Sequence, residues 1–548
     1  MSASKILAAL LAAGVLLAQP SMATPLAGPE AARSAENMKA HMTFLSSDLL
    51  EGRDAGSRGF DIAADYVASQ FRQLGLTPAG DNGTFFQHVP LWASRPTNQG
   101  SVVLKGPAGD VALVFGEDYF PGRTPAPGET HVAAPLVFVG FGVVDQQTGR
   151  DDYKGLDVKG KIVVALAGSP NGLPTEERAY YANGRTKRRE AAEHGAVGYI
   201  ALETPLGEKL RPFAQGLRTW DTWGMTWRGP DGQPFDPAPG VPSLASLSIK
   251  GAAKLFAGAP RSYDEVIAAA DATDAPSRFA LPVSADVRIT SETKIVESRN
   301  VAAMLPGSDR RLKDEVVLLS AHLDHIGITK PVNGDSINNG TLDNAAGVAT
   351  TLEVARAFAQ AKKPPRRSIL FLAVTGEEKG LLGAEYFARN PTVPLQKIAG
   401  DVDIDMPVLT YDFTDVVAFG ADRSGIGPAV RRAAGRVGVK LSDDPMPEEG
   451  LFTRSDHYRF VEVGVPAVFL MTGFANGGEK AYRSFLANCY HKPCDDLSQP
   501  IDYVAGAKFA RINYEITREL TDMPKRPTWN KGDFFGEKYA SGAQAAAR

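Results

Sequence analysis

The chain has 548 residues, more than one hydrophobic core usually serves, so we expect at least two domains. Its composition, 43% hydrophobic and 22% charged, is ordinary for a folded globular protein. A net charge of −4 supplies no basic surface for a phosphate backbone, which argues against a nucleic-acid partner.

Residues 1–23 have the pattern of an export signal. Lys5 precedes an apolar run from Ile6 to Ala18, and the small-residue ending Ser21-Met22-Ala23 predicts cleavage before Thr24. The run is too short for a retained transmembrane helix, and no later stretch is apolar enough to span a bilayer. We therefore expect a periplasmic or secreted protein with no membrane anchor after cleavage.

The first half of the mature chain contains two kinds of sequence pattern. Apolar spacing predicts a helix over residues 60–74, ended by Gly75. Residues 132–290 instead contain short β runs and glycine turns without an acid/base or metal set, which indicates an accessory domain. Within it, a cluster of basic residues predicts a solvated helix face, and a tryptophan-rich loop either lines a ligand cleft or pins a long segment. These residues are Arg185, Lys187, Arg188 and Arg189, and Trp220, Trp223 and Trp227.

After Ser298 the predicted elements alternate between strand and helix. Such alternation predicts a doubly wound α/β sheet. The strands are expected at 301–305, 316–320, 368–374, 398–404 and 466–471, and the helices at 344–360 and 504–520. The polar, alanine-rich tail beyond Asp522 is expected to be loosely ordered.

Histidines and carboxylates follow several of these strands. His322 and Asp324 end one strand, the pair Glu377 and Glu378 follows another, and Asp405 follows a third with Asp401 and Asp403 on its face. Each motif alone is weak, because a His-x-Asp pair usually belongs to a plain loop and paired glutamates favour any helix N-terminus. Together they predict a metal site, since ligands of open α/β sheets bind at the carboxyl ends of strands.

Two later segments offer a further histidine. Either His457, in an Arg-Ser-Asp-His segment, or His491, after Tyr490, could complete the site. The only two cysteines, Cys489 and Cys494, bracket His491, and in an oxidising compartment they are expected to form a disulfide; free thiols or thiolate ligands are the alternative.

Several motifs in order carry a family resemblance: FLSSDLLEGRDAGSRG, AHLDHIG, GTLDNAAGVA, TGEEKGLLGAEYF, DIDMP, TRSDHYRF and YHKPCDD. With these motifs the chain resembles the co-catalytic zinc aminopeptidases of the M28 type, and residues 132–290 resemble an inserted protease-associated (PA) domain. The resemblance implies the zinc exopeptidase fold, an open, mostly parallel mixed sheet sandwiched by helices, with a β-rich insertion. It divides the chain into a signal peptide (1–23), an N-terminal part of the peptidase domain (24–131), the PA-like domain (132–290), the catalytic domain (291–522) and a C-terminal tail (523–548).

The resemblance also implies roles for single residues. His322, Asp343 and Asp405 would hold one zinc, while Asp343, Glu378 and His491 would hold the other. Glu377 would be the general base, with Asp324 backing His322. Arg454 and Tyr490 match positions that contact the substrate or the tetrahedral intermediate in some members. His325 is expected either in the pocket wall or as a residue that supports a metal ligand. The implied cofactors are two Zn²⁺ ions, with Co²⁺ or Mn²⁺ as alternatives.

The function implied is removal of N-terminal residues from peptides outside the cytoplasm, through a metal-bridging hydroxide and the base Glu377. A carboxypeptidase or an N-acyl amidohydrolase on the same site is the nearest alternative. The other alternative is a receptor or binding protein that keeps the peptidase fold without catalysis, although such proteins usually lose ligands or the base.

Overall fold

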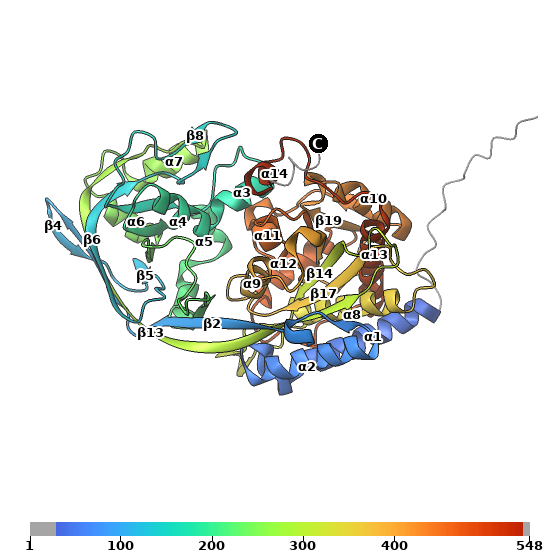
Figure 1. The fold of residues 1–548 in the computed structure, drawn as a ribbon. Coiled ribbons are helices and arrows are strands. Elements are labelled where there is room, and N and C mark those ends of the chain that lie inside the picture. The colour runs from blue at the N-terminus through green and yellow to red at the C-terminus, as the bar shows by residue number, and fades with distance from the viewer. Residues whose placement is uncertain (1–28, 541–548) are drawn as a thin grey trace, which may run out of the picture.

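A long antiparallel strand pair joins the two lobes of the molecule (Figure 1). In the computed structural model, which describes residues 29–540, β2 (Phe86–Pro96) pairs with the second half of β13 (Phe279–Leu305). The predicted export signal lies outside the described residues. Within them, no helix combines the length and apolar character needed to cross a membrane.

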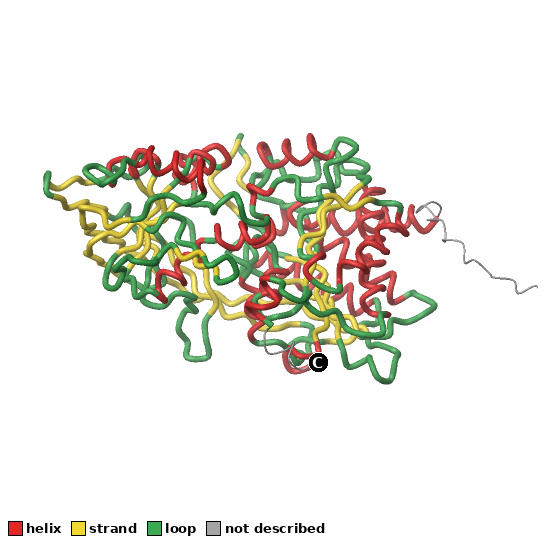
Figure 2. Tube along the Cα trace, turned by 90° about the horizontal axis from the view of Figure 1, so that it is seen from above, coloured by secondary structure: helices red, strands yellow, loops and turns green. Residues whose placement is uncertain are grey.

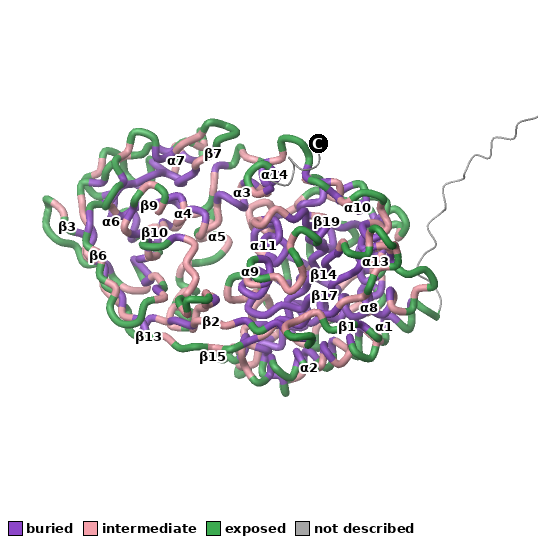
Figure 3. Tube along the Cα trace, viewed as in Figure 1, coloured by how far each residue is buried: buried purple, intermediate pink, exposed green. Residues whose placement is uncertain are grey.

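The first lobe is built on a mixed sheet whose central strands are parallel. From one edge the order is β20 (Lys440–Ser442), β19 (Asp415–Phe419), β21 (Ala467–Thr472), β18 (Ile398–Asp403), β14 (Val316–His322), β17 (Ser368–Val374) and β13. β19 runs antiparallel to β21, and β13 antiparallel to β17. Every residue of β14 and β17 is buried (Figure 3), as expected for parallel strands covered on both faces. The predicted α/β fold is confirmed.

Helices lie on both sides of this sheet (Figure 2). α8 (Ala346–Ala359) and α13 (Tyr503–Asp522) pack on β14; α1 (Pro29–Leu45) packs on both helices and α10 (Ile426–Val437) on α13, while α2 (Arg58–Gln73) packs on β13. α11 (His457–Val461) covers β18 and β21 and contacts α9 (Leu382–Arg389). The apolar stripe predicted for the closing helix is buried on α13, at Phe509, Ile512, Ile516 and Leu520.

The second lobe is built on the other part of the same continuous sheet, which reaches it through β13. β6 (Gly128–Phe138), β9 (Ile162–Leu166), β10 (Gly198–Leu202) and β12 (Ser243–Leu247) are parallel neighbours, and β5 (Tyr119–Pro121) pairs antiparallel with β12. The first half of β13 pairs with β6 and with β3 (Ser101–Gly106), which also pairs with β4 (Gly109–Ala112). The predicted domain boundaries at residues 131/132 and 290/291 therefore fall inside β6 and β13.

The remaining elements are short or lie at the lobe surfaces. The helices among them are α3 (Thr175–Ala182), α4 (Gly184–Glu193), α5 (Pro205–Leu210), α6 (Ile249–Leu255), α7 (Tyr263–Thr273), α12 (Gly478–Asn488) and α14 (Phe534–Tyr539). The strands are β1 (Thr77–Pro78), β7 (Val144–Asp145), β8 (Arg150–Asp151), β11 (Gly224–Trp227), β15 (Ile328–Val332) and β16 (Asp335–Ile337).

The predicted loose order of the tail is wrong for residues 523–540. Phe535 is fully buried, and its ring lies 4.9 Å from that of Phe452 in the first lobe and 6.1 Å from that of Tyr180 in the second. Phe534 is also buried against Tyr180. These aromatic side chains bind the segment to both lobes although the surrounding sequence is polar.

The tryptophan-rich loop pins its segment. Trp227 lies in β11, which pairs with β2, and its indole N–H donates to Glu385 at 3.2 Å. The side-chain cations of Arg95 and Lys294 lie 4.7 and 4.4 Å from the centroid of the Trp223 ring. These contacts fix the loop at the junction of the lobes.

The predicted solvated face of the basic helix is also wrong. On α4, Lys187 is 2% exposed, and its ammonium donates to the carbonyl oxygens of Phe141 and of Leu166, the latter at 3.0 Å. Arg185 crosses to the first lobe and pairs with the buried Glu385 at 2.8 Å. The long side chains reach backbone and carboxylate partners that the local sequence does not reveal.

Burial lowers the pKa of the Lys187 ammonium from 10.5 to about 7. Between these values the unfolded chain carries a proton that the folded protein lacks, so Lys187 makes the free energy of unfolding rise with pH and has no such effect below about pH 7. From pH 7.5 to 9.5 we expect wild type to gain up to about 2 kcal/mol relative to Lys187→Met in urea unfolding. Lys154→Met, at an exposed position, should follow wild type. Parallel pH profiles for wild type and Lys187→Met would contradict the lowered pKa.

Candidate metal centre

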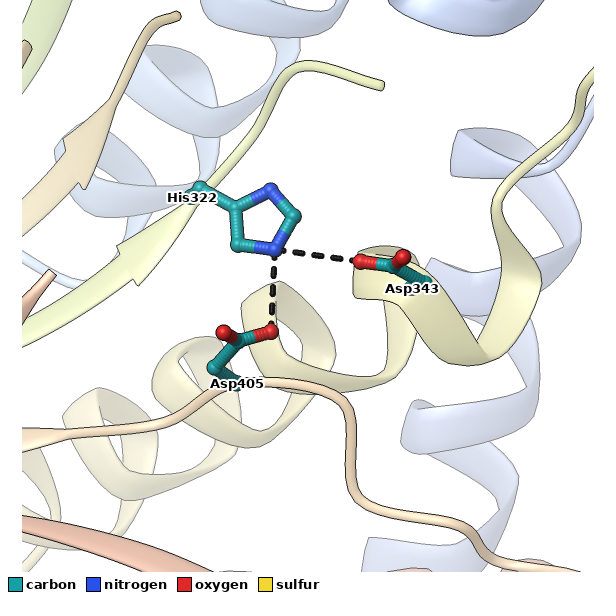
Figure 4. Close-up of side chains that lie close together, drawn as sticks. All are labelled: His322, Asp343 and Asp405. Atoms are coloured by element: carbon teal, nitrogen blue, oxygen red, sulfur yellow. Dashed lines mark hydrogen bonds and ion pairs between the residues drawn. The ribbon is translucent and has the colours of Figure 1, made fainter. Parts of the chain in front are cut away.

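Three predicted ligands converge at the carboxyl edge of the first-lobe sheet (Figure 4). His322 is the last residue of β14, Asp405 follows β18, and Asp343 lies in the turn that precedes α8. The Nε2 atom of His322 lies 3.0 Å from Oδ1 of Asp405 and 3.2 Å from Oδ1 of Asp343. All three residues are buried.

The other oxygen of Asp343 faces a second group. Nε2 of His491 lies 3.3 Å from Oδ2 of Asp343 and 3.0 Å from Oε2 of Glu378. His325, predicted either in the pocket wall or as a support for a ligand, places Nδ1 2.6 Å from Oε1 of Glu378 and has no partner for Nε2 in the described structure. The carboxylate of Asp343 is thus shared by two histidine-containing sets.

Asp324 contacts the site in a different way from the one predicted. Its backbone carbonyl, 3.1 Å from Nδ1 of His322, orients the imidazole. Its carboxylate accepts the backbone N–H groups of Glu377 at 3.1 Å and Glu378 at 3.4 Å. Asp324 therefore fixes both the ring of His322 and the start of the turn that carries the two glutamates.

Sequence reasoning missed Arg53, which is 1% exposed beneath this edge. Its guanidinium donates to the carbonyl oxygens of Leu323 at 2.9 Å, Asn339 at 2.6 Å and Gly340 at 3.0 Å, and also to that of Leu45. These bonds join the N-terminal segment to the His322 strand and the Asp343 turn. The only signal for this role was the place of Arg53 within the first of the motifs that carry the resemblance.

Gly340 shows how tightly the turn is packed. Its φ is +60°, and a Cβ there would lie 2.3 Å from the carbonyl oxygen of Asp343 and 2.6 Å from Cγ of His325. A larger residue would therefore displace either the turn or the imidazole, so glycine is required by both conformation and space.

Mutual contacts set the ionisation of these groups. Burial alone would raise the pKa of the Asp343 carboxyl, but hydrogen bonds with His322 and His491 hold it well below its usual range. Burial likewise opposes ionisation of Glu378, yet the charges of His491 and His325 lower its pKa. For Glu377, burial and the charges of Glu378 and Asp405 outweigh the opposing charge of His322 and raise its pKa well above the usual range.

A pocket opens beside the two sets. Asp343, Asp405 and Glu377 line its base, and its apolar wall consists of Met406, Met446, Leu451, Phe469, Met471 and Leu486. Arg454 donates to Glu449 at 3.0 Å and to the hydroxyl of Tyr490 at 3.2 Å, and all three line the pocket. The Tyr490 ring stacks on the imidazole of His491, with centroids 3.9 Å apart.

The remaining predicted residues divide clearly. Cys489 and Cys494 form a disulfide with Cα atoms 5.1 Å apart, closing the loop that contains His491. His457 is buried, with Nδ1 3.6 Å from Asp403, and belongs to neither ligand set. Asp401 and Asp403 are fully buried, and the hydroxyl of Ser320 lies between them, 3.0 and 2.9 Å from their carboxylate oxygens.

The donor atoms fit two divalent cations. His322, Asp343 and Asp405 could hold one, and Asp343, Glu378 and His491 the other. Imidazole nitrogens and carboxylate oxygens are common zinc ligands, and three protein ligands per ion leave a position open as in catalytic sites. His325 also comes close enough to Asp343 and Glu378 to hold an ion with them.

The part of the chain that carries this site matches a known protein family. Residues 300–517 match the model described as Peptidase family M28. This part of the chain is an M28 peptidase domain. The match spans β14, β17, β18 and β21 together with every predicted metal ligand.

Two curated relatives of the M28 domain are each described as a probable zinc metalloprotease. The protein from Pyricularia oryzae is 28% identical over 262 residues, which cover 42% of this chain and 51% of the relative. The protein from Pyrenophora tritici-repentis is 35% identical over 263 residues, or 42% of this chain and 59% of the relative. The matched region thus spans only about half the length of these relatives.

A solved structure shares the fold over most of the chain. The aminopeptidase from Aneurinibacillus sp. strain AM-1 has a TM-score of 0.53 at 20% identity, and the match covers 90% of this chain and 96% of that one. The likeness therefore extends beyond the M28 domain into the second lobe.

Replacement of Arg53 by methionine should destabilise the protein. It would leave four backbone carbonyl groups without their buried donor, so we expect a loss of about 3–5 kcal/mol in urea unfolding. Arg58→Met, at an exposed position of the neighbouring helix α2, is the matched control and should change stability by less than about 0.5 kcal/mol. Equal losses in the two variants would show that the Arg53 contacts contribute little.

Proposed function

We propose that the chain is an extracytoplasmic metallopeptidase that holds two zinc ions and removes N-terminal residues from peptides. The observation that carries the proposal is the position of Asp343, whose two oxygens face separate ligand sets beside a pocket that Glu377 also lines. The M28 match and the relatives described as zinc metalloproteases support zinc and peptide hydrolysis. Co²⁺ and Mn²⁺ use similar ligands and are the alternatives.

When bound at these ligands, the ions would supply Lewis acidity that polarises the scissile carbonyl and makes a water easier to deprotonate. Glu377 lines the pocket next to Asp343 and Asp405. Cations held by these carboxylates would offset their negative charge and favour the ionised form of Glu377, which could then take a proton from the attacking water and deliver it to the leaving amine. The backbone N–H of Glu377 is held by Asp324, which fixes the origin of its side chain. Arg454 and Tyr490 would hydrogen-bond the substrate, and the apolar wall would receive a side chain.

Action at the amino end is supported by the name of the solved relative with the same fold, an aminopeptidase. Export is supported by the pattern of residues 1–23 and by the disulfide, because such bonds persist in oxidising compartments. The second lobe, with its parallel β6, β9, β10 and β12, is assigned as the PA-like domain in this proposal.

Glu377→Gln should keep both ions and lose turnover. The amide preserves size and hydrogen bonding but cannot accept the proton, so we expect kcat on an aminoacyl anilide to fall roughly 10²–10⁴-fold. Metal content measured by mass spectrometry should stay at wild-type level. Glu479→Gln, an exposed change on α12, should retain full activity. Near-normal kcat in Glu377→Gln would remove Glu377 from its assigned role.

The site of attack is tested with one peptide in two forms, with a free and with an acetylated amino terminus. We expect release of the first residue from the free peptide only, loss of activity with a chelator, and recovery on adding Zn²⁺. Equal cleavage of the acetylated peptide would favour a carboxypeptidase or an N-acyl amidohydrolase. Tight zinc binding without cleavage of any peptide in a broad panel would favour the receptor alternative.

A further inference from the structure

The turn that presents Asp343 is held from the side of the His491 loop by a residue with no assigned role. Asp495 is fully buried and lies four residues after His491. One oxygen of its carboxylate accepts the backbone N–H of Leu342 at 2.9 Å, and the other accepts that of Asp343 at 3.1 Å. Its own carbonyl oxygen accepts the N–H of Thr341 at 3.1 Å.

These hydrogen bonds replace those that regular structure would supply. Asp343 has φ −119° and ψ 84°, and Asn344 has φ −138° and ψ 40°, so the turn departs from helical geometry before α8 begins. In the described structure, the N–H groups of Leu342 and Asp343 are buried and bond to Asp495. Loss of its carboxylate would leave two buried donors unpaired, which favours a different turn conformation.

The turn is clamped from its other end by Arg53, whose guanidinium binds the carbonyl oxygens of Asn339 and Gly340. In the five-residue segment 339–343, Arg53 therefore donates to backbone carbonyl groups and Asp495 accepts from backbone N–H groups. Both ions are buried and hydrogen-bonded to this segment, and the negative charge of Asp495 favours the charged form of Arg53.

The same loop also presents His491. The N–H of Asp495 donates to the carbonyl of Lys492 at 3.0 Å, which makes residues 492–495 one turn, and the disulfide of Cys494 with Cys489 closes that turn around His491. Gln499 fixes it further by donating to the carbonyl of Cys494 at 2.7 Å. His491, a proposed metal ligand, and Asp495, which binds the turn of Asp343, therefore belong to one cross-linked loop.

We propose that Asp495 is a positioning residue for both metal ions: it holds the backbone of Asp343 so that each carboxylate oxygen faces one ligand set. This inference rests on the proposed function, because it assigns to Asp343 the bridging place. A shift of the Asp343 backbone would move both oxygens together, so loss of Asp495 should weaken both sites, whereas loss of His491 should weaken mainly one.

The test compares Asp495→Asn and Asp495→Ala with Asp496→Asn in the full chain. Asp496 is adjacent, and its side chain accepts only the N–H of Ser498 in the described structure, so the same substitution there is a matched control. Zinc affinity is measured by competition with a chromophoric chelator, kcat and KM on the aminoacyl anilide, and stability by thermal unfolding of metal-free protein.

For Asp495→Asn, which keeps one acceptor oxygen, we expect zinc affinity to fall roughly 10- to 100-fold at both sites. At saturating zinc kcat should remain depressed with KM changed little. Asp495→Ala should be affected more strongly, and Asp496→Asn should match wild type. Wild-type zinc affinity and kcat in Asp495→Asn, even with a lowered melting temperature, would reduce Asp495 to a structural role and overturn the proposal.

The two proposals can fail separately. If wild type binds two zinc ions but cleaves no peptide, the proposed function is wrong, while lowered zinc affinity in Asp495→Asn would still support the positioning role. If wild type is an active zinc peptidase and Asp495→Asn binds and turns over normally, only the positioning role is wrong.

Discussion

The constraint that organises this protein is the concentration of buried carboxylates at one edge of one sheet. Asp343, Glu378 and Asp405 meet there, and buried carboxylates are costly unless cations or hydrogen-bond donors face them. The histidines provide part of that compensation, and a pair of divalent ions would provide the rest. β14, β17 and β18 each lead into acidic residues at this edge, whereas β21 contributes the apolar pocket residues Phe469 and Met471.

Further polar residues hold the backbone turns and carboxylates at this edge of the sheet. Asp324 holds the turn of the two glutamates through backbone N–H groups, as Asp495 holds the turn of Asp343. Below them Ser320 bridges Asp401 and Asp403. In two places, then, the carboxylate of one acidic residue accepts hydrogen bonds from the backbone N–H groups of a turn that carries another acidic residue. One carboxylate suffices for each turn because it can accept two N–H groups at once.

The sequence predicted those parts of the fold that depend on local pattern. β17 agrees residue for residue with its predicted range, 368–374, because a fully apolar run between charged and glycine-rich segments fits only a buried strand. The convergence of His322 and Asp405 was predictable because the carboxyl ends of parallel strands meet, whereas Asp343, in the turn before a helix, was assigned by the family resemblance. The family resemblance then selected His491 over His457, a choice that the residues alone left open.

The parts that were missed depend on partners distant in sequence. The sequence around Lys187 and Arg53, basic in one case and glycine-containing in the other, gives no sign of their roles. Only the fold brings backbone carbonyl groups around their side chains. β13 was predicted over 301–305 alone, although it extends from residue 279, because half-exposed polar residues interrupt its alternation and its partner strands lie far away in the chain. Tertiary pairing overrides such weak local signals.

The β2–β13 pair has a mechanical consequence. Pro96 and Ser291 face each other across this ladder, so the chain leaves for the second lobe and returns at neighbouring points of one ribbon. β11 pairs with the other edge of β2 next to this point, which makes the ladder three strands wide there. Away from this ladder the lobes also meet through the ion pairs of Arg185 with the buried Glu385 and of Arg211 with the pocket residue Glu449, and through the rings of Phe535 and Tyr180. A change in the position of the second lobe would therefore have to bend the ladder and break these side-chain contacts together.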